Sequence, residues 1–487
     1  MLRLHHDEHA HGNGSASHVR PAQRYVVPGL QNLGNTCFFN AILQALAAVG
    51  SFPQYLDEVV EESEERGKHI PFTRALRDCI HDLTPVPSEA GSPSAVVPKR
   101  LNQELCTKLA SFRGNKQQDS QELLQFLINI VNDEQKRCAR SDGGLKDLFP
   151  SSLAPFSGSI SDLCFEDALE ERRWNPLYGL QVDLLQCSGC ARYRPMTNRR
   201  FLDVSLSFGD AVDSKKPITL WDCLRMYTAP EVISGVECTY CTANQELMLK
   251  RRDCKQLELE YATTGAMETE LEVHQIKEDI YTLENLLAGD AESLYQLEIS
   301  DSRCRALRDR YKRLQFSRCP DVFCFHFNRK VFHYSGHARK LDTHVVFPIE
   351  LDMSPFCRYE QSSHENGRPL DAGMNDTRRH LVYELVAVIL HHGNERYGHF
   401  TAFRRVRATR QWFFISDDNV REAREDEVLS SCAYMLFYER KYRRRSATAK
   451  TNGHDKRAPG NGKPLSDEES EDEEAALARV PDESSLR

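Results

Sequence analysis

The fold of this chain can be approached from the stretch GLQNLGNTCFFN, residues 29–40, which continues into AILQAL, residues 41–46. Glycine and asparagine in its first half predict a turn. Apolar residues spaced three or four apart from residue 38 onward predict a helix, which Asn35 or Thr36 could cap. Cys37 is therefore expected at a helix N-terminus, where the dipole and free backbone N–H groups lower a thiol pKa. Such a thiol is a candidate nucleophile, and a buried structural cysteine is the alternative.

Asn32 precedes Cys37 by five residues. A turn at this point could bring the side-chain amide of Asn32 beside the sulfur. An amide N–H in that position can stabilise the oxyanion that forms when a nucleophile attacks a carbonyl group. The stretch therefore offers a nucleophile together with an oxyanion donor.

Partners for Cys37 lie near the other end of the chain. The segment HHGNERYGHFTAF, residues 391–403, follows a strand-like run at residues 383–390, and WFFISDDNV, residues 412–420, comes after it. These stretches resemble the Cys box and the His box of the ubiquitin-specific proteases, a family of deubiquitinating cysteine proteases, and the resemblance covers about residues 27–440. The Ser-Asp-Asp run and the ending AYMLFYER, residues 433–440, are most similar to the mitochondrial outer-membrane members of animals and plants.

The resemblance implies an α+β, papain-like fold of thumb, palm and fingers, with a structural zinc ribbon in the fingers. It also implies hydrolysis of the isopeptide or peptide bond after the C-terminal glycine of ubiquitin, which removes ubiquitin from protein conjugates. Cys37 would attack as the thiolate, His399 would take the thiol proton and return it to the leaving amine, and Asn32 would bind the oxyanion. Gly398 would leave room beside His399 for the thin tail of ubiquitin.

The residue that orients His399 departs from the commonest pattern of the family. Most members have Asp or Asn after the aromatic strand, whereas this chain, like the mitochondrial relatives, has a serine, Ser416, which Asp417 follows. A serine hydroxyl can fix the imidazole tautomer but adds no negative charge. We expect Ser416 to orient His399, with Asp417 as a supporting or substitute acceptor.

The run QQDSQELLQFLI, residues 117–128, predicts a capped amphipathic helix. Asp119 and Glu122 are three residues apart and would share an exposed face, as at any solvated helix start. The resemblance implies more, because the family uses the matching Gln117, Asp119 and Glu122 to hold the arginine-bearing tail of ubiquitin.

Two CxxC pairs, Cys187 with Cys190 and Cys238 with Cys241, are separated by 47 residues. Each pair can bind one edge of a tetrahedral zinc ion, and together they make a closed, all-sulfur site of the structural kind. Cysteines retained without a metal, and redox chemistry, are the alternatives. In the resembling family this site ties together the tips of the fingers.

An insertion is expected at about residues 245–318, between the second CxxC pair and a strand that begins at Val322. Apolar residues follow an approximate three-four spacing from Ile276 to Leu314 on a charged background. A helical hairpin packed on the fingers is one interpretation. A coiled coil over about residues 265–315 that binds a partner or a second copy of the chain is the other.

The composition of the chain limits the partners that it can be expected to bind and the compartments in which it can be expected to occur. Of the net charge of −9, the segment Pro464–Arg487 carries −7, so the rest of the chain is nearly neutral and nucleic acid is not expected as a partner. No apolar run approaches 18 residues, which predicts no membrane span. The cysteines together with the absence of a signal peptide favour a reducing compartment. We expect a cytoplasmic protein, with the mitochondrial outer membrane suggested only by the resemblance.

The predicted organisation is a His-rich, disordered tail at residues 1–24, a catalytic domain at 25–440, and a disordered basic, then acidic, tail at 441–487. Within the domain, the thumb would span about residues 29–174, and the fingers and palm about 175–440. Two competing hypotheses are a catalytically dead ubiquitin-binding scaffold and an enzyme that acts on a ubiquitin-like modifier. The presence of Asn32, Cys37 and His399 favours an active enzyme.

Overall fold

The computed structural model describes residues 24–90, 93–114, 117–139, 174–194, 198–208, 217–289, 305–332, 338–357, 381–394 and 397–441. Chain contacts divide the protein into Met1–Lys441 and Tyr442–Arg487, and all the described residues belong to the first unit. Apart from residues 24 and 441, the two predicted tails therefore lie outside the described residues.

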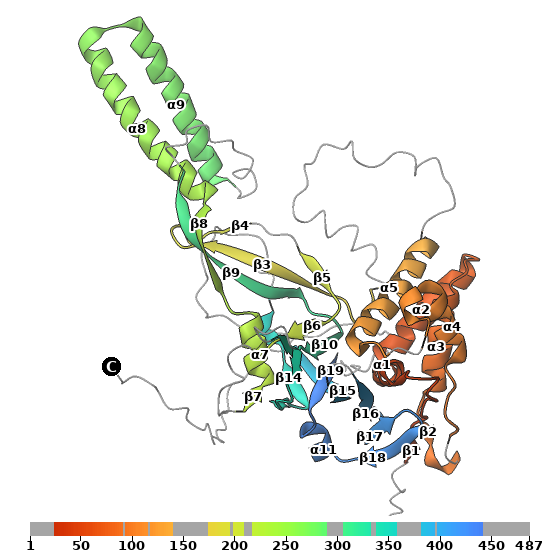
Figure 1. The fold of residues 1–487 in the computed structure, drawn as a ribbon. Coiled ribbons are helices and arrows are strands. Elements are labelled where there is room, and N and C mark those ends of the chain that lie inside the picture. The colour runs from red at the N-terminus through yellow and green to blue at the C-terminus, as the bar shows by residue number, and fades with distance from the viewer. Residues whose placement is uncertain are drawn as a thin grey trace, which may run out of the picture. The chain divides into compact units, whose positions relative to one another are not determined.

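Five helices in the first third of the chain pack together (red to orange in Figure 1). The first of them is buried on nearly every side, since eleven of its twelve residues are buried, as expected for a helix that is apolar all round. Its core continues into the central sheet through Phe400 and Ala402. The helices are α1 (Cys37–Ala48), α2 (Ser51–Glu65), α3 (Pro71–Asp82), α4 (Lys99–Lys108) and α5 (Ser120–Ala139).

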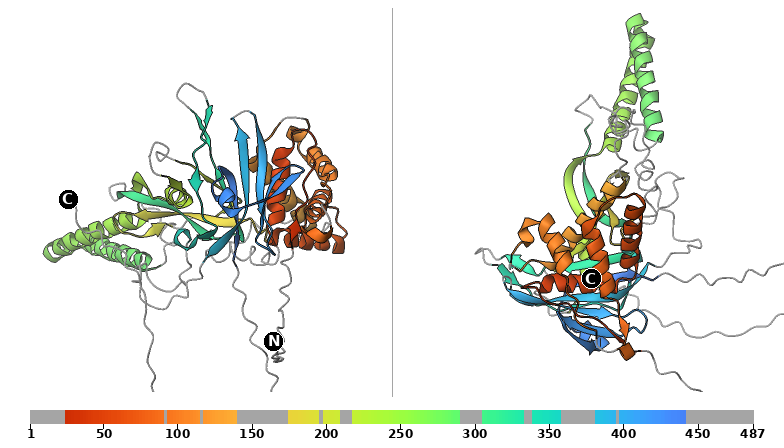
Figure 2. Two further views of the ribbon diagram at one scale, coloured as in Figure 1. Left: turned by 90° about the horizontal axis from the view of Figure 1, so that it is seen from below. Right: turned by 90° about the vertical axis from the view of Figure 1, so that its right-hand side faces the viewer.

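Within the part of the chain that the structure describes, the central sheet has eight strands in the order β18-β17-β16-β15-β19-β10-β6, with β14 also paired to β15. The helices of the first third lie on one side of it (Figure 2). All pairs are antiparallel except β10 with β6. The strands are β6 (Val204–Leu206), β10 (Val322–Phe327), β14 (Glu350–Asp352), β15 (Val382–Gly393), β16 (Gly398–Arg405), β17 (Trp412–Ser416), β18 (Asn419–Ala423) and β19 (Ala433–Arg440).

A second sheet has the order β4-β3-β9-β8, with β5 also paired to β3. Its strands are β3 (Gly179–Cys187), β4 (Tyr193–Arg194), β5 (Arg199–Phe201), β8 (Glu231–Glu237) and β9 (Leu307–Arg318). The helical prediction for the end of the insertion is therefore wrong at Leu307–Arg318. The three-four spacing there is incidental, because pairing with β3 and β8 on both sides outweighs local propensity.

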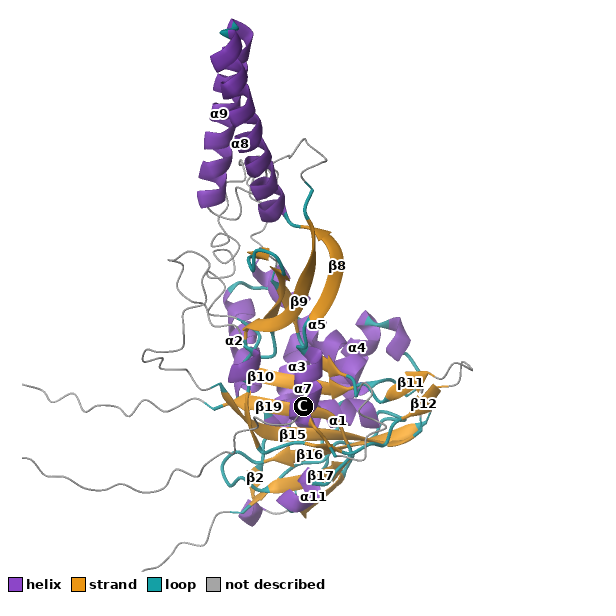
Figure 3. Ribbon diagram, turned by 90° about the vertical axis from the view of Figure 1, so that its left-hand side faces the viewer, coloured by secondary structure: helices purple, strands orange, loops and turns teal. Residues whose placement is uncertain are grey.

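The other part of the insertion forms two packed helices, α8 (Thr239–Thr264) and α9 (Met267–Ala288), which Figure 3 shows as one hairpin. Gly265 between them has a left-handed backbone, with φ of 63°, and beyond its two chain neighbours no atom lies within 4 Å of the position a Cβ would take. Leu247 of α8 and Leu283 of α9 share a small core. Lys250 pairs with Asp279 at 2.8 Å. The predicted positions between residues 290 and 304 lie outside the described residues.

Short elements complete the described chain. Cys319 and Cys357 form a disulfide, a pairing that the sequence analysis did not predict. Among the described helices, none combines the length and the apolar character that crossing a membrane requires. The short elements are β1 (Tyr25–Val26), β2 (Val86–Pro87), β7 (Ile218–Thr219), α7 (Leu220–Tyr227), β11 (Lys330–Phe332), β12 (Ala338–Lys340), β13 (Val345–Val346) and α11 (Glu425–Leu429).

Candidate active site

Cys37 is the first residue of α1, as predicted, and its side chain is buried. Its sulfur accepts from the backbone N–H of Phe400 and from Nε2 of Gln117, each at 3.5 Å. The predicted fall in the thiol pKa is wrong. Burial raises the pKa of Cys37 and the charge of Asp417 raises it further, and these effects outweigh the N–H groups of Phe400 and Phe38.

The loop before Cys37 is held by its own side chains. Thr36 occupies the cap position but makes no side-chain bond to the helix, and its hydroxyl instead accepts from the N–H of Leu33 at 2.9 Å. The side-chain oxygen of Asn32, Oδ1, accepts from the backbone N–H groups of Gly34 at 2.9 Å and Thr36 at 3.1 Å. The predicted cap by Thr36 is therefore wrong, because the Thr36 hydroxyl bonds within the preceding turn.

Asp417 lies at the centre of an amide cluster. Its carboxylate accepts from Nδ2 of Asn32 at 2.9 Å and from Nδ2 of Asn40 at 2.7 Å, and its backbone carbonyl accepts from the N–H of Leu30 at 2.9 Å. The Asn32 amide, which was expected at the sulfur, thus donates to Asp417. Asn40 was missed by the sequence analysis, although a polar residue buried on an apolar helix was a usable signal.

His399 lies on β16, one residue before the Phe400 N–H that contacts Cys37. Its Nε2 is 2.8 Å from the hydroxyl oxygen of Ser416, the last residue of β17. The imidazole of His399 thus lies beside Ser416, and the next residue along β16 contacts Cys37 through its backbone N–H, whereas Asp417 is bonded to the two asparagines.

Gly398 has a structural reason that the sequence analysis did not give. A Cβ at this position would lie 2.2 Å from Nε2 of His391 and 2.3 Å from the carbonyl oxygen of His392, so the hairpin itself requires glycine. The His391 ring stacks on Phe400 with the centroids 4.5 Å apart. Burial lowers the pKa of His391 to about 4, with a smaller contribution from the charge of Lys340, so this imidazole is neutral at pH 7.

The three residues predicted to hold the ubiquitin tail have different surroundings. Gln117 forms two bonds with Gly398: its Nε2 donates to the carbonyl oxygen at 2.6 Å, and its Oε1 accepts from the N–H at 3.1 Å. Asp119 caps α5, since it accepts from the N–H of Gln121 at 2.7 Å, and it also accepts from the Tyr434 hydroxyl at 2.5 Å. Asp119 is thus partly buried, against the prediction, whereas Glu122 is exposed.

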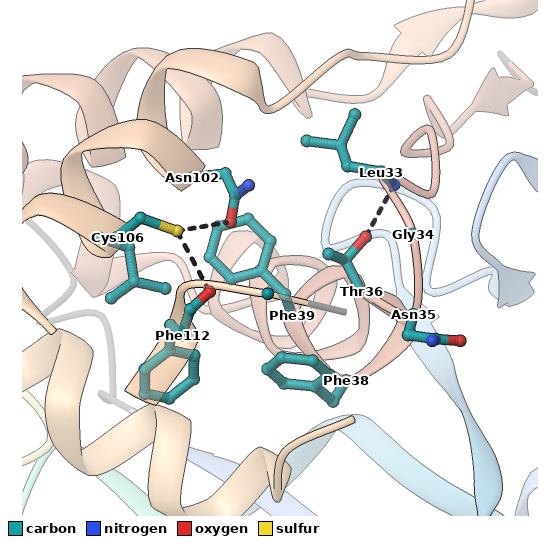
Figure 4. A pocket seen from close by; sticks show the side chains of 11 residues that line it. Leu33, Gly34, Asn35, Thr36, Phe38, Phe39, Asn102, Cys106 and Phe112 are labelled. Carbon is teal, nitrogen blue, oxygen red and sulfur yellow. Dashed lines mark hydrogen bonds between the residues drawn. The ribbon is translucent and has the colours of Figure 1, made fainter. Parts of the chain in front are cut away.

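A cavity of about 170 Å³ lies behind the turn before Cys37 (Figure 4). Leu33, Phe38 and Phe112 are among the residues that line it. Cys106 is on its wall, with its sulfur 3.2 Å from the carbonyl oxygen of Phe112 and 4.0 Å from Oδ1 of Asn102. The Cys106 thiol is thus hydrogen-bonded within the cavity wall, and Cys37 is not among the residues that line this cavity.

The comparison with known families decides what this site belongs to. A family model described as ubiquitin carboxyl-terminal hydrolase matches residues 28–438, a range that contains the loop before Cys37, His399 and Ser416. The chain belongs to the ubiquitin carboxyl-terminal hydrolase family. The predicted family and the predicted function, thiol-dependent deubiquitination, are thereby confirmed.

Individual relatives match this hydrolase over most of their length. It is 29% identical to ubiquitin carboxyl-terminal hydrolase 27 of Arabidopsis thaliana, over 85% of the chain and 86% of the relative. It is 27% identical to ubiquitin carboxyl-terminal hydrolase 30 of Danio rerio, over 88% and 89%. A solved structure of the SAGA Ubp8/Sgf11/Sus1/Sgf73 DUB module bound to ubiquitin aldehyde matches with a TM-score of 0.53 and 20% identity, over 85% of the hydrolase and 70% of that chain. The predicted α+β fold is confirmed.

The hydrolase brings its four predicted metal ligands together at one end of the second sheet. The sulfurs of Cys187, Cys190, Cys238 and Cys241 all lie within 4.8 Å of one another. Cys187 and Cys241 are 3.8 Å apart, and Cys190 and Cys238 are 3.7 Å apart. Two sulfurs bound to one tetrahedral zinc ion at about 2.3 Å lie about 3.8 Å apart, so these cysteines fit a four-thiolate metal site.

Proposed function

We propose that Cys37, His399 and Ser416 form the catalytic triad with which this hydrolase cleaves the bond after the C-terminal glycine of ubiquitin. One observation carries the proposal. Nε2 of His399 is 2.8 Å from the Ser416 hydroxyl, and the residue that follows His399, Phe400, donates its backbone N–H to the Cys37 sulfur at 3.5 Å. A nucleophile beside a base, with the base oriented by a third group, is the arrangement that acyl transfer requires.

In this mechanism His399 accepts the proton of the Cys37 thiol, and the thiolate attacks the carbonyl carbon of the terminal glycine. The tetrahedral intermediate collapses to a thioester, and His399 returns the proton to the leaving lysine amine. Water then attacks the thioester with His399 as the base. Because burial raises the pKa of the Cys37 thiol, the thiolate does not form by itself, and the proton transfer to His399 is a necessary step.

Asn32 is the proposed oxyanion donor, and Asp417 is the residue that positions it. One N–H of the Asn32 amide is committed to the Asp417 carboxylate, which leaves its second N–H for the oxyanion. In this role Asp417 supports the function of Ser416 only indirectly. It fixes the loop that precedes Cys37, because its carboxylate accepts hydrogen bonds from Asn32 and Asn40.

The ubiquitin tail is proposed to lie between α5 and β16, where Gln117 contacts Gly398. Glu122 is exposed and free to receive an arginine of the tail. Asp119 is the other predicted contact of the tail, but its carboxylate already caps α5 and accepts from the Tyr434 hydroxyl. Tail binding through Asp119 would therefore add to a structural role.

Zinc is the proposed occupant of the four-cysteine site. Cys187 and Cys190 lie at the end of β3 and the turn after it, whereas Cys238 and Cys241 lie at the start of α8. When bound, the ion would join these two segments and supply no chemistry to the reaction. Its place beyond the second sheet supports a structural role.

The helical hairpin of α8 and α9 is a proposed partner-binding element, because Met248, Leu259, Leu271 and Tyr281 are each about 70% exposed along it.

A cytoplasmic location is also proposed, and residence at the mitochondrial outer membrane rests on the sequence resemblance alone. Imaging of the tagged protein beside a mitochondrial marker tests the location.

The decisive experiment is reaction of the purified, zinc-loaded protein with ubiquitin that carries a thiol-reactive electrophile at its C-terminus. We expect one covalent adduct, absent in Cys37→Ala. The matched control is Cys106→Ala, which removes the thiol on the neighbouring cavity and should leave the adduct intact. No adduct from the folded wild-type protein would favour the scaffold hypothesis. An adduct formed only with a ubiquitin-like modifier would show that this modifier, and not ubiquitin, is the substrate.

A further inference from the structure

His399 lies on a part of the central sheet that only two strands support. Pairing of β15 with β19 stops at Leu390 opposite Ala433, and pairing of β16 with β17 starts at Ala402 opposite Ile415. Among the described residues, 391–393 and 398–400 therefore pair only with one another. We name this part of the sheet the histidine ribbon. A two-stranded ribbon is at best marginally stable in water, so something else has to hold its geometry.

The outer edge of the histidine ribbon is occupied by a lysine. Nζ of Lys340 donates to the backbone carbonyl of His391 at 2.7 Å and to that of Gly393 at 2.9 Å. The N–H of Asn394 donates to Tyr397 across the ribbon, so the carbonyls of the alternate residues 391 and 393 point to the opposite edge. That is the edge which β19 does not reach. The ammonium thus occupies the place of a missing strand.

Lys340 is held firmly enough to do this. Its side chain is only 12% exposed, whereas Asp342, 3.5 Å from the ammonium, is 76% exposed. The next residue, Leu341, is bonded in both directions to Arg329: its N–H donates to the Arg329 carbonyl at 2.7 Å, and its carbonyl accepts from the guanidinium at 2.9 Å. Arg329 is buried and also donates to the carbonyl of Ala433, where β19 begins.

The other edge of the histidine ribbon is held by Gln117 through its two bonds to Gly398. The ribbon therefore has one anchor on each side, Gln117 from the helical lobe and Lys340 from the sheet. Between them lie His399 and the Phe400 N–H that contacts the Cys37 sulfur. An error of about 1 Å in such a placement can cost on the order of 100-fold in rate.

We propose that Lys340 is a positioning residue, which takes the place of an edge strand and fixes His399 and the Phe400 N–H relative to Cys37. The inference rests on the proposed roles of Cys37 and His399.

The test compares Lys340→Met, Lys340→Gln and Lys340→Arg with Asp342→Asn as the matched control. Steady-state hydrolysis of ubiquitin with a fluorogenic C-terminal amide gives kcat and KM. Binding of unmodified ubiquitin to each variant in a Cys37→Ala background gives Kd, and thermal unfolding checks the fold. We expect Lys340→Met to lower kcat by roughly 10- to 100-fold with KM and Kd within about twofold of wild type. Lys340→Arg should recover most of kcat, because a guanidinium can also donate to two carbonyls, and Asp342→Asn should be unchanged.

Several outcomes would overturn the inference. An unchanged kcat in Lys340→Met would show that the histidine ribbon does not depend on the lysine. A loss confined to KM and Kd would make Lys340 a ubiquitin contact. If Lys340→Met fails to fold, Lys340→Gln, which keeps N–H donors without the charge, carries the same prediction at a smaller loss. Wild-type protein without activity would instead count against the proposed function, so the two failures are distinguishable.

Discussion

The hydroxyl oxygen of Ser416 lies 2.8 Å from Nε2 of His399, so a neutral group and not a carboxylate faces this nitrogen. Ser416→Ala removes this bond and leaves the imidazole free to change its tautomer. We expect kcat to fall about tenfold with KM nearly unchanged, a smaller loss than for Cys37→Ala or His399→Ala. Hydrolysis of a fluorogenic ubiquitin amide measures this, and an equal loss for all three variants would contradict it.

Asp417→Asn should separate the reactivity of the thiol from turnover. Without the negative charge the pKa of Cys37 falls, so the thiolate forms at lower pH and alkylation by iodoacetamide at pH 7 becomes faster. Hydrolysis should slow by tenfold or more, on the order expected for a disturbed oxyanion site, because the acceptor for Asn32 and Asn40 is weakened. Rates of alkylation and hydrolysis that fall together would refute this division of roles.

Replacing Asp119 should destabilise the protein more than replacing Glu122. Asp119→Ala removes the cap of α5 and the acceptor of the Tyr434 hydroxyl, which should lower the free energy of unfolding by about 1 to 2 kcal/mol. Glu122→Ala changes an exposed side chain and should alter stability by less than about 0.5 kcal/mol. Urea unfolding tests both. The cap explanation would fail if Asp119→Ser, which can cap the helix, were as unstable as Asp119→Ala.

Metal removal should destabilise the second sheet and the hairpin together, because the four cysteines join β3 to α8. We expect a strong chelator, or Cys187→Ser, to lower Tm by about 5 to 10 °C. Cys106→Ser is the control, since its side chain lies outside the cluster and can keep its bond to the Phe112 carbonyl. Zinc is measured by mass spectrometry of the native protein, and a zinc-free protein with an unchanged Tm would refute the assignment.

Gly398→Ala should greatly reduce activity because it distorts the β15–β16 hairpin, and not because it narrows the space for the ubiquitin tail. The added methyl group would lie 2.3 Å from the His392 carbonyl, so the backbone beside His399 has to move. We expect kcat to fall by about 100-fold while Kd for ubiquitin, measured in a Cys37→Ala background, changes much less. A variant that keeps kcat but loses ubiquitin binding would instead show that the change narrows the space for the ubiquitin tail.

The residues of the site that could be predicted carry strong local signals. Cys37 follows a glycine- and asparagine-rich turn at a helix start, and His399 and Ser416 stand at strand ends within recognisable motifs. The two CxxC pairs likewise specify their own geometry. Such features depend on a few neighbouring residues, which is why sequence alone reveals them.

What could not be predicted depends on contacts between distant parts of the chain. Asn32 was assigned to the sulfur, but Asp417, 385 residues away, competes for its amide. The thiol pKa was misjudged because burial, which only the packed structure defines, outweighs the helix terminus. The contribution of Phe400 comes from its backbone N–H, so no side chain signals it. The role of Lys340 cannot be seen in the sequence, because it depends on where the pairing of β15 with β19 stops, at Leu390 opposite Ala433.

The turn at Gly265 between α8 and α9 offers a practical handle. Its neighbours from Thr263 to Met267 are all exposed, and beyond the adjacent residues no atom lies within 4 Å of where a Cβ on the glycine would be. Exposed loop tips of this kind tolerate added sequence well. A fluorescent domain or a spectroscopic label spliced between Gly265 and Ala266 would leave both chain termini and the Cys37 site untouched. The insertion thus provides a ready attachment point for following single molecules of the enzyme on ubiquitin chains.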